Sequence, residues 1–159
     1  MNPPLKVIPV VLITGASRGI GAAAAESFSG AGWRVAISAR TQTDNQPLDH
    51  QLRRPDGSLL AGSLASTAAR VLALGGEVFV HTMDLMQPDS LDAAVDATLA
   101  HYGRIDLLIN NAVYQDRETN SLVSDLQCDA LERTLQGNVI APFLLVRRLL
   151  PVMLAQGGG

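Results

Sequence analysis

Two kinds of apolar pattern alternate along the chain and predict an α/β protein. Short runs rich in β-branched residues are typical of strands buried on both faces, and longer stretches with apolar residues every three or four positions are typical of helices. The predicted strands cover residues 7–13, 33–38, 77–83 and 105–110, and the predicted helices cover residues 22–31, 66–74, 88–102 and 129–155. Because strands and helices alternate, we expect a parallel sheet with helices on both faces.

Glycine and proline mark the ends of these elements. Gly32, Gly75 and Gly103 each follow a predicted helix, where a left-handed residue ends the hydrogen-bonding pattern. Pro88 opens the third helix, and Pro142 lies inside the last one, where we expect a kink. The last helix carries an apolar stripe at helical spacing: Leu131, Leu135, Val139, Phe143, Val146, Leu150 and Met153.

The segment 41–63 is polar and longer than a usual connection between a strand and a helix. It contains Pro47, Pro55, Gly57 and Gly62, which favour turns over regular structure. We therefore predict an extended surface loop. A disordered insertion without a role is the alternative.

Composition and charge narrow the class of protein. The chain has 159 residues, the length of one domain, and is 47% hydrophobic, which is enough for a core. A net charge of −3 without a basic stripe argues against nucleic acid as a partner. The single cysteine, Cys128, excludes an internal disulfide, and no Cys/His spacing suits a metal. Without a secretory signal in 1–10 or a long uncharged apolar run, we expect a cytoplasmic protein without a membrane span.

A glycine-rich turn joins the first strand to the first helix and predicts a phosphate-binding site. Gly15 would allow the tight turn, Gly19 would let the backbone approach a pyrophosphate, and Gly21 would allow close packing of the helix. The helix that follows offers free N–H groups and the positive end of its dipole. An ordinary glycine-rich turn is the alternative interpretation.

The run Thr14-Gly15-Ala16-Ser17-Arg18-Gly19-Ile20-Gly21 resembles the signature of the short-chain dehydrogenase/reductase family. Further along, residues 104–112 resemble the same family's fourth strand and its Asn-Asn-Ala motif. The resemblance implies a Rossmann-type doubly wound sheet and a single NAD(P)-binding domain over residues 1–159. It also implies hydride transfer between the nicotinamide and a small carbonyl or alcohol substrate.

Cofactor choice is set at the end of the second strand, where a carboxylate would bind the ribose of NAD. Here the sequence is Ser38-Ala39-Arg40, with no acid. Arg40, together with Arg18, is expected to bind a 2′-phosphate, which favours NADP(H) over NAD(H). Arg40 as a solvated loop cation is the alternative.

The resemblance extends the expected cofactor site to the ends of the third and fourth strands. It implies that Asp84 and Leu85 border the adenine, although Asp84 as a cap of the turn before Pro88 is a second interpretation. It implies that Asn110 and Asn111 contact the ribose and brace the sheet. The expected cofactor-binding residues are Gly15, Ser17, Arg18, Gly19, Ile20, Gly21, Arg40, Asp84, Leu85, Asn110, Asn111 and Ala112.

Asn138 is the one catalytic candidate. It matches the family's helix asparagine, which distorts the helix and holds a water in the proton relay. A satisfied core amide is the alternative.

The family's chemistry needs a serine and a tyrosine with a lysine four residues later. The only lysine is Lys6, so neither Tyr102 nor Tyr114 has that partner. We therefore expect a C-terminally incomplete domain, truncated after the fourth strand and the following helix and inactive alone. A catalytically silent dinucleotide-binding module and a nonfunctional fragment are the alternatives. Without the strands it would cover, the last helix is expected to expose leucine and valine side chains and to cause aggregation or dependence on another chain. The resemblance implies a homo-oligomer of the complete protein, because this helix often contributes to a subunit interface in the family. Nothing in the sequence identifies the substrate.

Overall fold

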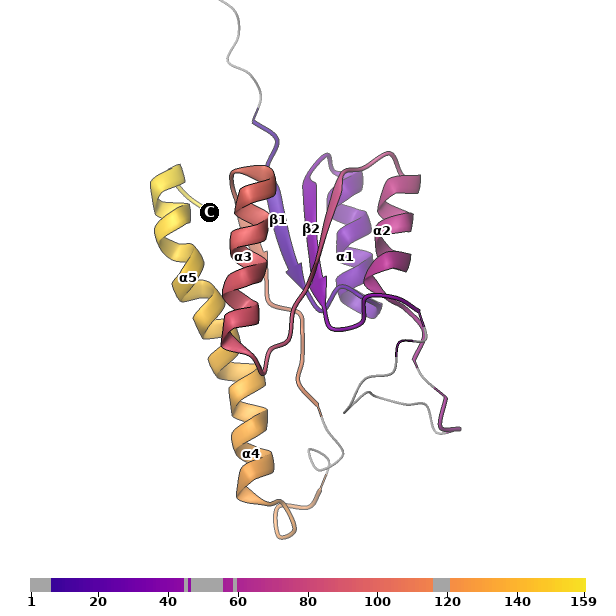
Figure 1. Ribbon diagram of the computed structural model, residues 1–159, viewed down its shortest axis with the longest axis vertical. Helices are drawn as coiled ribbons and strands as arrows, with labels where there is room; N and C mark the ends of the chain where they lie inside the picture. Colours follow the sequence, from indigo (N-terminus) through magenta and orange to yellow (C-terminus); the bar gives the residue numbers. More distant parts are fainter. Residues whose placement is uncertain (1–6, 45, 47–55, 59, 116–120) are drawn as a thin grey trace, which may run out of the picture.

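The fold is a four-stranded parallel sheet covered by helices on both faces (Figure 1). The computed structural model describes residues 7–44, 46, 56–58, 60–115 and 121–159. The strands are β1 (Val10–Thr14), β2 (Arg34–Ala39), β3 (Val78–Thr82) and β4 (Leu107–Ile109), in the order β3-β2-β1-β4. All three strand pairs are parallel, which confirms the predicted doubly wound sheet.

The helices are α1 (Gly19–Gly30), α2 (Leu64–Ala73), α3 (Pro88–Tyr102), α4 (Cys128–Leu135) and α5 (Ala141–Gln156), with the π-helical turn η2 (Gln136–Ile140) between the last two. Figure 1 shows α1 and α2 side by side on one face of the sheet, while α3 and α5 lie together on the other. Pro88 opens α3, and Gly103 ends it with φ of 77°, as predicted.

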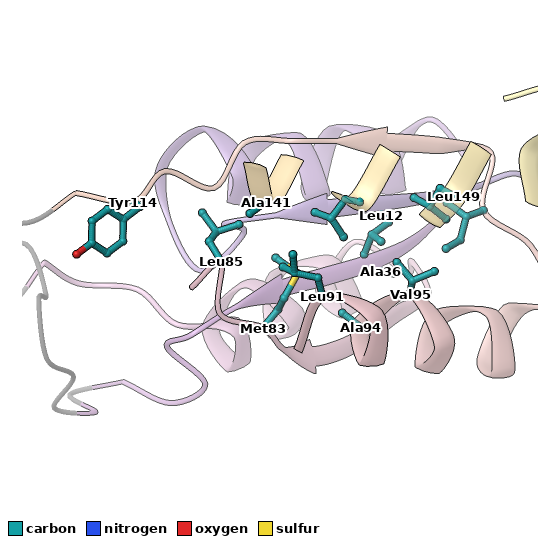
Figure 2. Close-up of a cluster of buried hydrophobic side chains, with 12 residues drawn as sticks. Leu12, Ala36, Met83, Leu85, Leu91, Ala94, Val95, Tyr114, Ala141 and Leu149 are labelled. Atoms are coloured by element: carbon teal, nitrogen blue, oxygen red, sulfur yellow. The ribbon is translucent and has the colours of Figure 1, made fainter. Parts of the chain in front are cut away.

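Each face of the sheet has its own core, because successive residues of a strand point to opposite faces. Val11 and Ile13 of β1 pack toward α1 and α2. Leu12, between them, packs toward α3 and α5 and belongs to the same core cluster as Leu145 and Leu149. Figure 2 shows Leu12 and Leu149 within this cluster. These side chains are at most 1% exposed. Near-continuous apolar strands are therefore explained by burial on both faces.

The first strand is shorter than predicted. It begins at Val10, and Val7 before it is 58% exposed. Proline at position 9 offers no N–H to a sheet. Within the predicted loop 41–63, residues 45, 47–55 and 59, which include Pro47 and Pro55, lie outside the described residues.

The last predicted helix differs most from expectation. It is interrupted by the π-helical turn, in which the N–H of Ala141 bonds to the carbonyl of Gln136. Pro142, just beyond, has no N–H to donate to the preceding turn, so the regular pattern of α-helical hydrogen bonds is interrupted there. The change of geometry therefore precedes the proline, and the ribbon bends at the junction of α4 and α5 (Figure 1).

The expectation that the last helix exposes apolar side chains is confirmed. Most of the predicted stripe is exposed, and the side chains of Leu131, Leu135, Val139, Phe143, Val146 and Leu150 are 46–59% exposed. The buried positions are instead Ala130, Gly137, Ala141, Leu145 and Leu149. The helix is apolar on both sides, so its period alone does not select the face that packs.

The continuous helical segment Cys128–Gln156 is long and apolar enough to cross a membrane by length and composition. A single helix of this kind is weak support for a membrane protein, since a core helix passes the same test. Here α5 packs on α3, and Arg148 forms ion pairs with Asp92 and Asp96 of that helix.

Candidate functional site

The glycine-rich turn between β1 and α1 lies against the segment that follows β4. Gly15 has φ of 69°, and a Cβ there would come within 2.7 Å of the Cα of Ala112. A Cβ on Gly21 would come within 2.5 Å of the Asn111 amide nitrogen and 2.6 Å of the Gly15 carbonyl oxygen. Any side chain at either position would therefore push the two segments apart.

Thr14 and Asn111 join these two segments by hydrogen bonds. The Thr14 hydroxyl accepts from the backbone N–H groups of Asn111 and Ala112, each at 3.0 Å. The Asn111 amide donates to the carbonyls of Thr14 and Gly15, at 3.0 and 3.2 Å. Asn111 thus braces the sheet with its side chain. Asn110, by contrast, is exposed and does not line the pocket described below.

The first turn of α1 is free to receive an anion. No side chain caps the helix, and its first turn holds no acidic residue. Gly19, which opens the helix with φ of 56°, has nothing within 4 Å of the place where a Cβ would be. The N–H groups and the dipole of this turn therefore favour a negatively charged ligand. Ile20 in this turn is 82% exposed.

A pocket opens at the carboxyl ends of the strands, where ligands bind in open α/β sheets. Seven of the predicted cofactor residues line it: Gly15, Ser17, Arg18, Arg40, Asp84, Leu85 and Ala112. The others, Gly19, Ile20, Gly21, Asn110 and Asn111, lie outside its lining. Two chemical features thus meet in one place: the glycine-rich turn and a pair of arginines.

Arg18 and Arg40 come from different segments but face the same pocket. Burial and the nearby charge of Arg40 both hold the pKa of Arg18 below its ordinary value. The Nη2 of Arg18 donates to the carbonyl of Gly62 at 2.9 Å and to the hydroxyl of Thr41 at 3.3 Å. No hydrogen bond or ion pair holds Arg40 among the described residues. Two adjacent cations form a suitable site for a doubly charged anion such as a phosphate.

Asp84 serves the turn before α3 and also faces the pocket. Its Oδ1 accepts from the backbone N–H of Met86 at 3.0 Å, and its own N–H donates to the Ser90 hydroxyl at 2.9 Å. The predicted turn role is therefore present in the structure. Leu85 beside it is 7% exposed and belongs to both the core and the pocket wall.

Asn138 lies in the π-helical turn, so the helix is distorted at the residue where the resemblance implied it. Both ends of its side-chain amide are bonded to the main chain of Tyr114. The side chain of Asn138 therefore fits the alternative prediction of a core amide that is held by hydrogen bonds. Tyr114 is 4% exposed, and it reaches the pocket wall from the segment after β4.

Several wall residues were not predicted from the sequence: Ala39, Thr41, Met83, Val113, Tyr114 and Gln115. Each lies within a few residues of the carboxyl end of β2, β3 or β4. The rule that ligands bind at this end of a parallel sheet was the signal that could have identified them. Across the described part of the chain, no group of three or more possible ligands is placed to hold a metal.

Comparison with known proteins identifies relatives over nearly the whole chain. The short chain dehydrogenase family matches residues 9–62 and 58–159. An uncharacterized oxidoreductase of Mycobacterium tuberculosis is 33% identical over 144 residues, which cover 91% of this chain and 37% of the relative. The chain therefore spans less than half of that relative's length.

Solved structures that resemble this chain are also oxidoreductases by name. A metagenomic short-chain oxidoreductase in complex with NADP is 30% identical, with a TM-score of 0.75, and the match covers 95% of this chain and 59% of that one. The F189W actinorhodin polyketide ketoreductase with NADPH is 25% identical, with a TM-score of 0.75 and coverage of 96% and 51%. Sequence and fold lead to the same conclusion: the chain belongs to the short-chain dehydrogenase family.

Proposed function

We propose that this chain binds NADP(H) at the pocket and contributes the cofactor site of an oxidoreductase that acts on a carbonyl or alcohol substrate. The main support is the meeting of Arg18 and Arg40 beside the glycine-rich turn, where no acidic residue ends β2. Similar solved proteins carry NADP or NADPH. A cytoplasmic compartment, where Cys128 would stay reduced, belongs to the same proposal.

The pocket residues suggest how the cofactor would be held. The N–H groups at the start of α1 would bind the pyrophosphate, and the two arginines would bind the 2′-phosphate. Asp84 and Leu85 would border the adenine, while Ala112 and Asn111 would keep the backbone after β4 close to the ribose. Bound NADPH supplies a hydride for reduction of a carbonyl group.

Titration of the 159-residue chain with NADPH tests this proposal. Trp33 is the only tryptophan, and energy transfer from it to the cofactor reports binding. We expect saturable binding that is tighter for NADPH than for NADH. Absence of binding by a folded sample would contradict the proposal.

The arginine assignment has its own test. Arg40→Asp should weaken NADPH binding about tenfold or more and shift the preference toward NADH, because a carboxylate repels the 2′-phosphate and suits a 2′-hydroxyl. Arg147→Asp is the matched control, since it makes the same charge change on the exposed surface of α5. Equal effects of the two substitutions would argue against the assignment.

A dinucleotide-binding module without chemistry of its own is the second candidate. It is favoured by the Asn138 side-chain amide, whose oxygen and nitrogen each already form a hydrogen bond with the main chain of Tyr114. The two candidates differ in turnover. If the chain with bound NADPH reduces any of a panel of ketones and aldehydes, so that NADPH is oxidised, the enzyme is supported. Binding without oxidation supports the module.

A further inference from the structure

The segment 41–63 is tied to the glycine-rich turn at its base, which is formed by residues 41–42 and 62–65. The N–H groups of Leu64 and Ala65 donate to the carbonyls of Thr41 and Gln42, at 2.9 and 3.0 Å. These bonds close the two ends of the segment against each other. They also hold Thr41, which lines the pocket, and Gly62, two residues before Leu64, at the base of the segment.

Both of these residues bind Arg18. Its Nη2 donates to the Gly62 carbonyl and to the Thr41 hydroxyl, at 2.9 and 3.3 Å. Gly62 has φ of 116°, and a Cβ there would come within 2.6 Å of the Ser17 carbonyl oxygen and 2.8 Å of the Arg18 Cβ. Only glycine can therefore place its carbonyl against the arginine at this distance.

This contact offsets an electrostatic cost. Arg18 is partly buried next to Arg40, and two like charges in a region of reduced dielectric repel each other. Without an anion, hydrogen bonds must hold the first guanidinium in place. A carbonyl and a hydroxyl acceptor bonded to a cation can supply that stabilisation.

We propose that Gly62 and Thr41 are positioning residues that hold Arg18 beside Arg40 and so preorganise the site for a 2′-phosphate. This inference rests on the proposed function and adds the part of the chain that sets its specificity. Preorganisation raises affinity because binding then does not bear the cost of bringing the two cations together. The base of the 41–63 segment thus acts on the phosphate through Arg18.

The test compares affinities for NADPH and NADH, measured by titration of each variant. Gly62→Ala should lower the preference for NADPH about tenfold, while the affinity for NADH changes little. Gly57→Ala is the matched control: it has a positive φ of 82° in the same segment, with nothing within 4 Å of the Cβ position. It should leave the preference unchanged.

Thr41 provides an independent variant that keeps the shape of the side chain. Thr41→Val removes the hydroxyl and should lower the NADPH preference about threefold, and Thr41→Ser should restore it. Far-UV circular dichroism checks that each variant is folded.

The outcomes separate the two proposals. Equal losses of affinity for both cofactors in folded Gly62→Ala would show a merely structural role and overturn the positioning inference while leaving cofactor binding intact. A wild-type chain that binds neither cofactor would overturn the proposed function, and this inference with it.

Discussion

The side-chain amide of Asn138 pairs with the main chain of Tyr114 in both directions. Its Oδ1 accepts the Tyr114 N–H at 2.8 Å, and its Nδ2 donates to the Tyr114 carbonyl at 2.9 Å. Gly137, next to it, lies so close that a Cβ there would come within 2.3 Å of the Tyr114 Cβ. The π-helical turn therefore holds the segment after β4, and with it one wall of the pocket.

Asn138→Ala should destabilise the protein by about 2 kcal/mol, because it removes two part-buried hydrogen bonds to the main chain of Tyr114. Urea unfolding followed by circular dichroism measures the loss. Asn110→Ala, at an exposed position, is the control and should change stability by no more than about 0.5 kcal/mol. Unfolding midpoints that agree between the two variants would contradict the role given to this pair.

Gly15→Ala should cost about 2 kcal/mol or more, since φ of 69° disfavours any side chain and the new Cβ would press on the Ala112 backbone. Gly30→Ala is the matched control. It lies at the exposed end of α1 with open space around it, so the change should be neutral or slightly stabilising. Thermal unfolding of the two variants distinguishes strain from a general effect of the extra methyl group. A Gly15→Ala protein as stable as the wild type would show that the turn can move.

Asp106 should make stability depend on pH in the acid range. Its carboxylate binds the Arg104 guanidinium and accepts the Val10 N–H at 2.8 Å, and the Arg104 hydrogen bond, with a smaller contribution from Val10, lowers its pKa. A carboxyl whose pKa is lower in the folded state stabilises the protein above its unfolded pKa of about 4. That contribution is lost as the pH falls below about 4 and through the folded pKa.

The comparison is between wild type and Asp106→Asn, by urea unfolding from pH 7 to pH 2. At pH 7 the variant should be less stable by about 1–2 kcal/mol, and the difference should shrink in acid. Asp129→Asn is the control, because that carboxyl pairs with Arg133 at an exposed position where solvent screens the interaction. A difference for Asp106→Asn that stays constant with pH would contradict the assignment.

The exposed stripe of α4 and α5 should drive self-association of the chain. Phe143 and Leu150 are 59% and 51% exposed, and contiguous apolar surface of this kind favours contact with other chains. Phe143→Lys combined with Leu150→Lys should shift sedimentation toward the monomer. Leu72→Lys on α2, where the leucine is 59% exposed, is the control. If the Leu72 variant dissociates assemblies to the same extent, the stripe is not the contact surface.

The period of apolar residues was sufficient to predict the strands, most helices and the parallel sheet, because burial on both faces leaves a direct record in the sequence. In the last helix, the stripe beginning at Leu131 is exposed while Ala141 and Leu145 are buried, so apolar side chains lie on both sides of the helix. Which side packs depends on the shape of α3 and on the small residues that allow close approach. Those are properties of the assembled layers rather than of one segment.

The sequence by itself determined the glycine-rich turn, the arginine that follows β2, the missing acid there and the asparagine inside the last helix. These features are local, since each follows from residue type at a position within one element. Only the tertiary structure decided that Thr41 and Gly62 bind Arg18 and that Tyr114 occupies the Asn138 amide. Such contacts join segments 23–44 residues apart. They depend on where the sheet brings loop ends together, for which a single sequence carries no periodic signal.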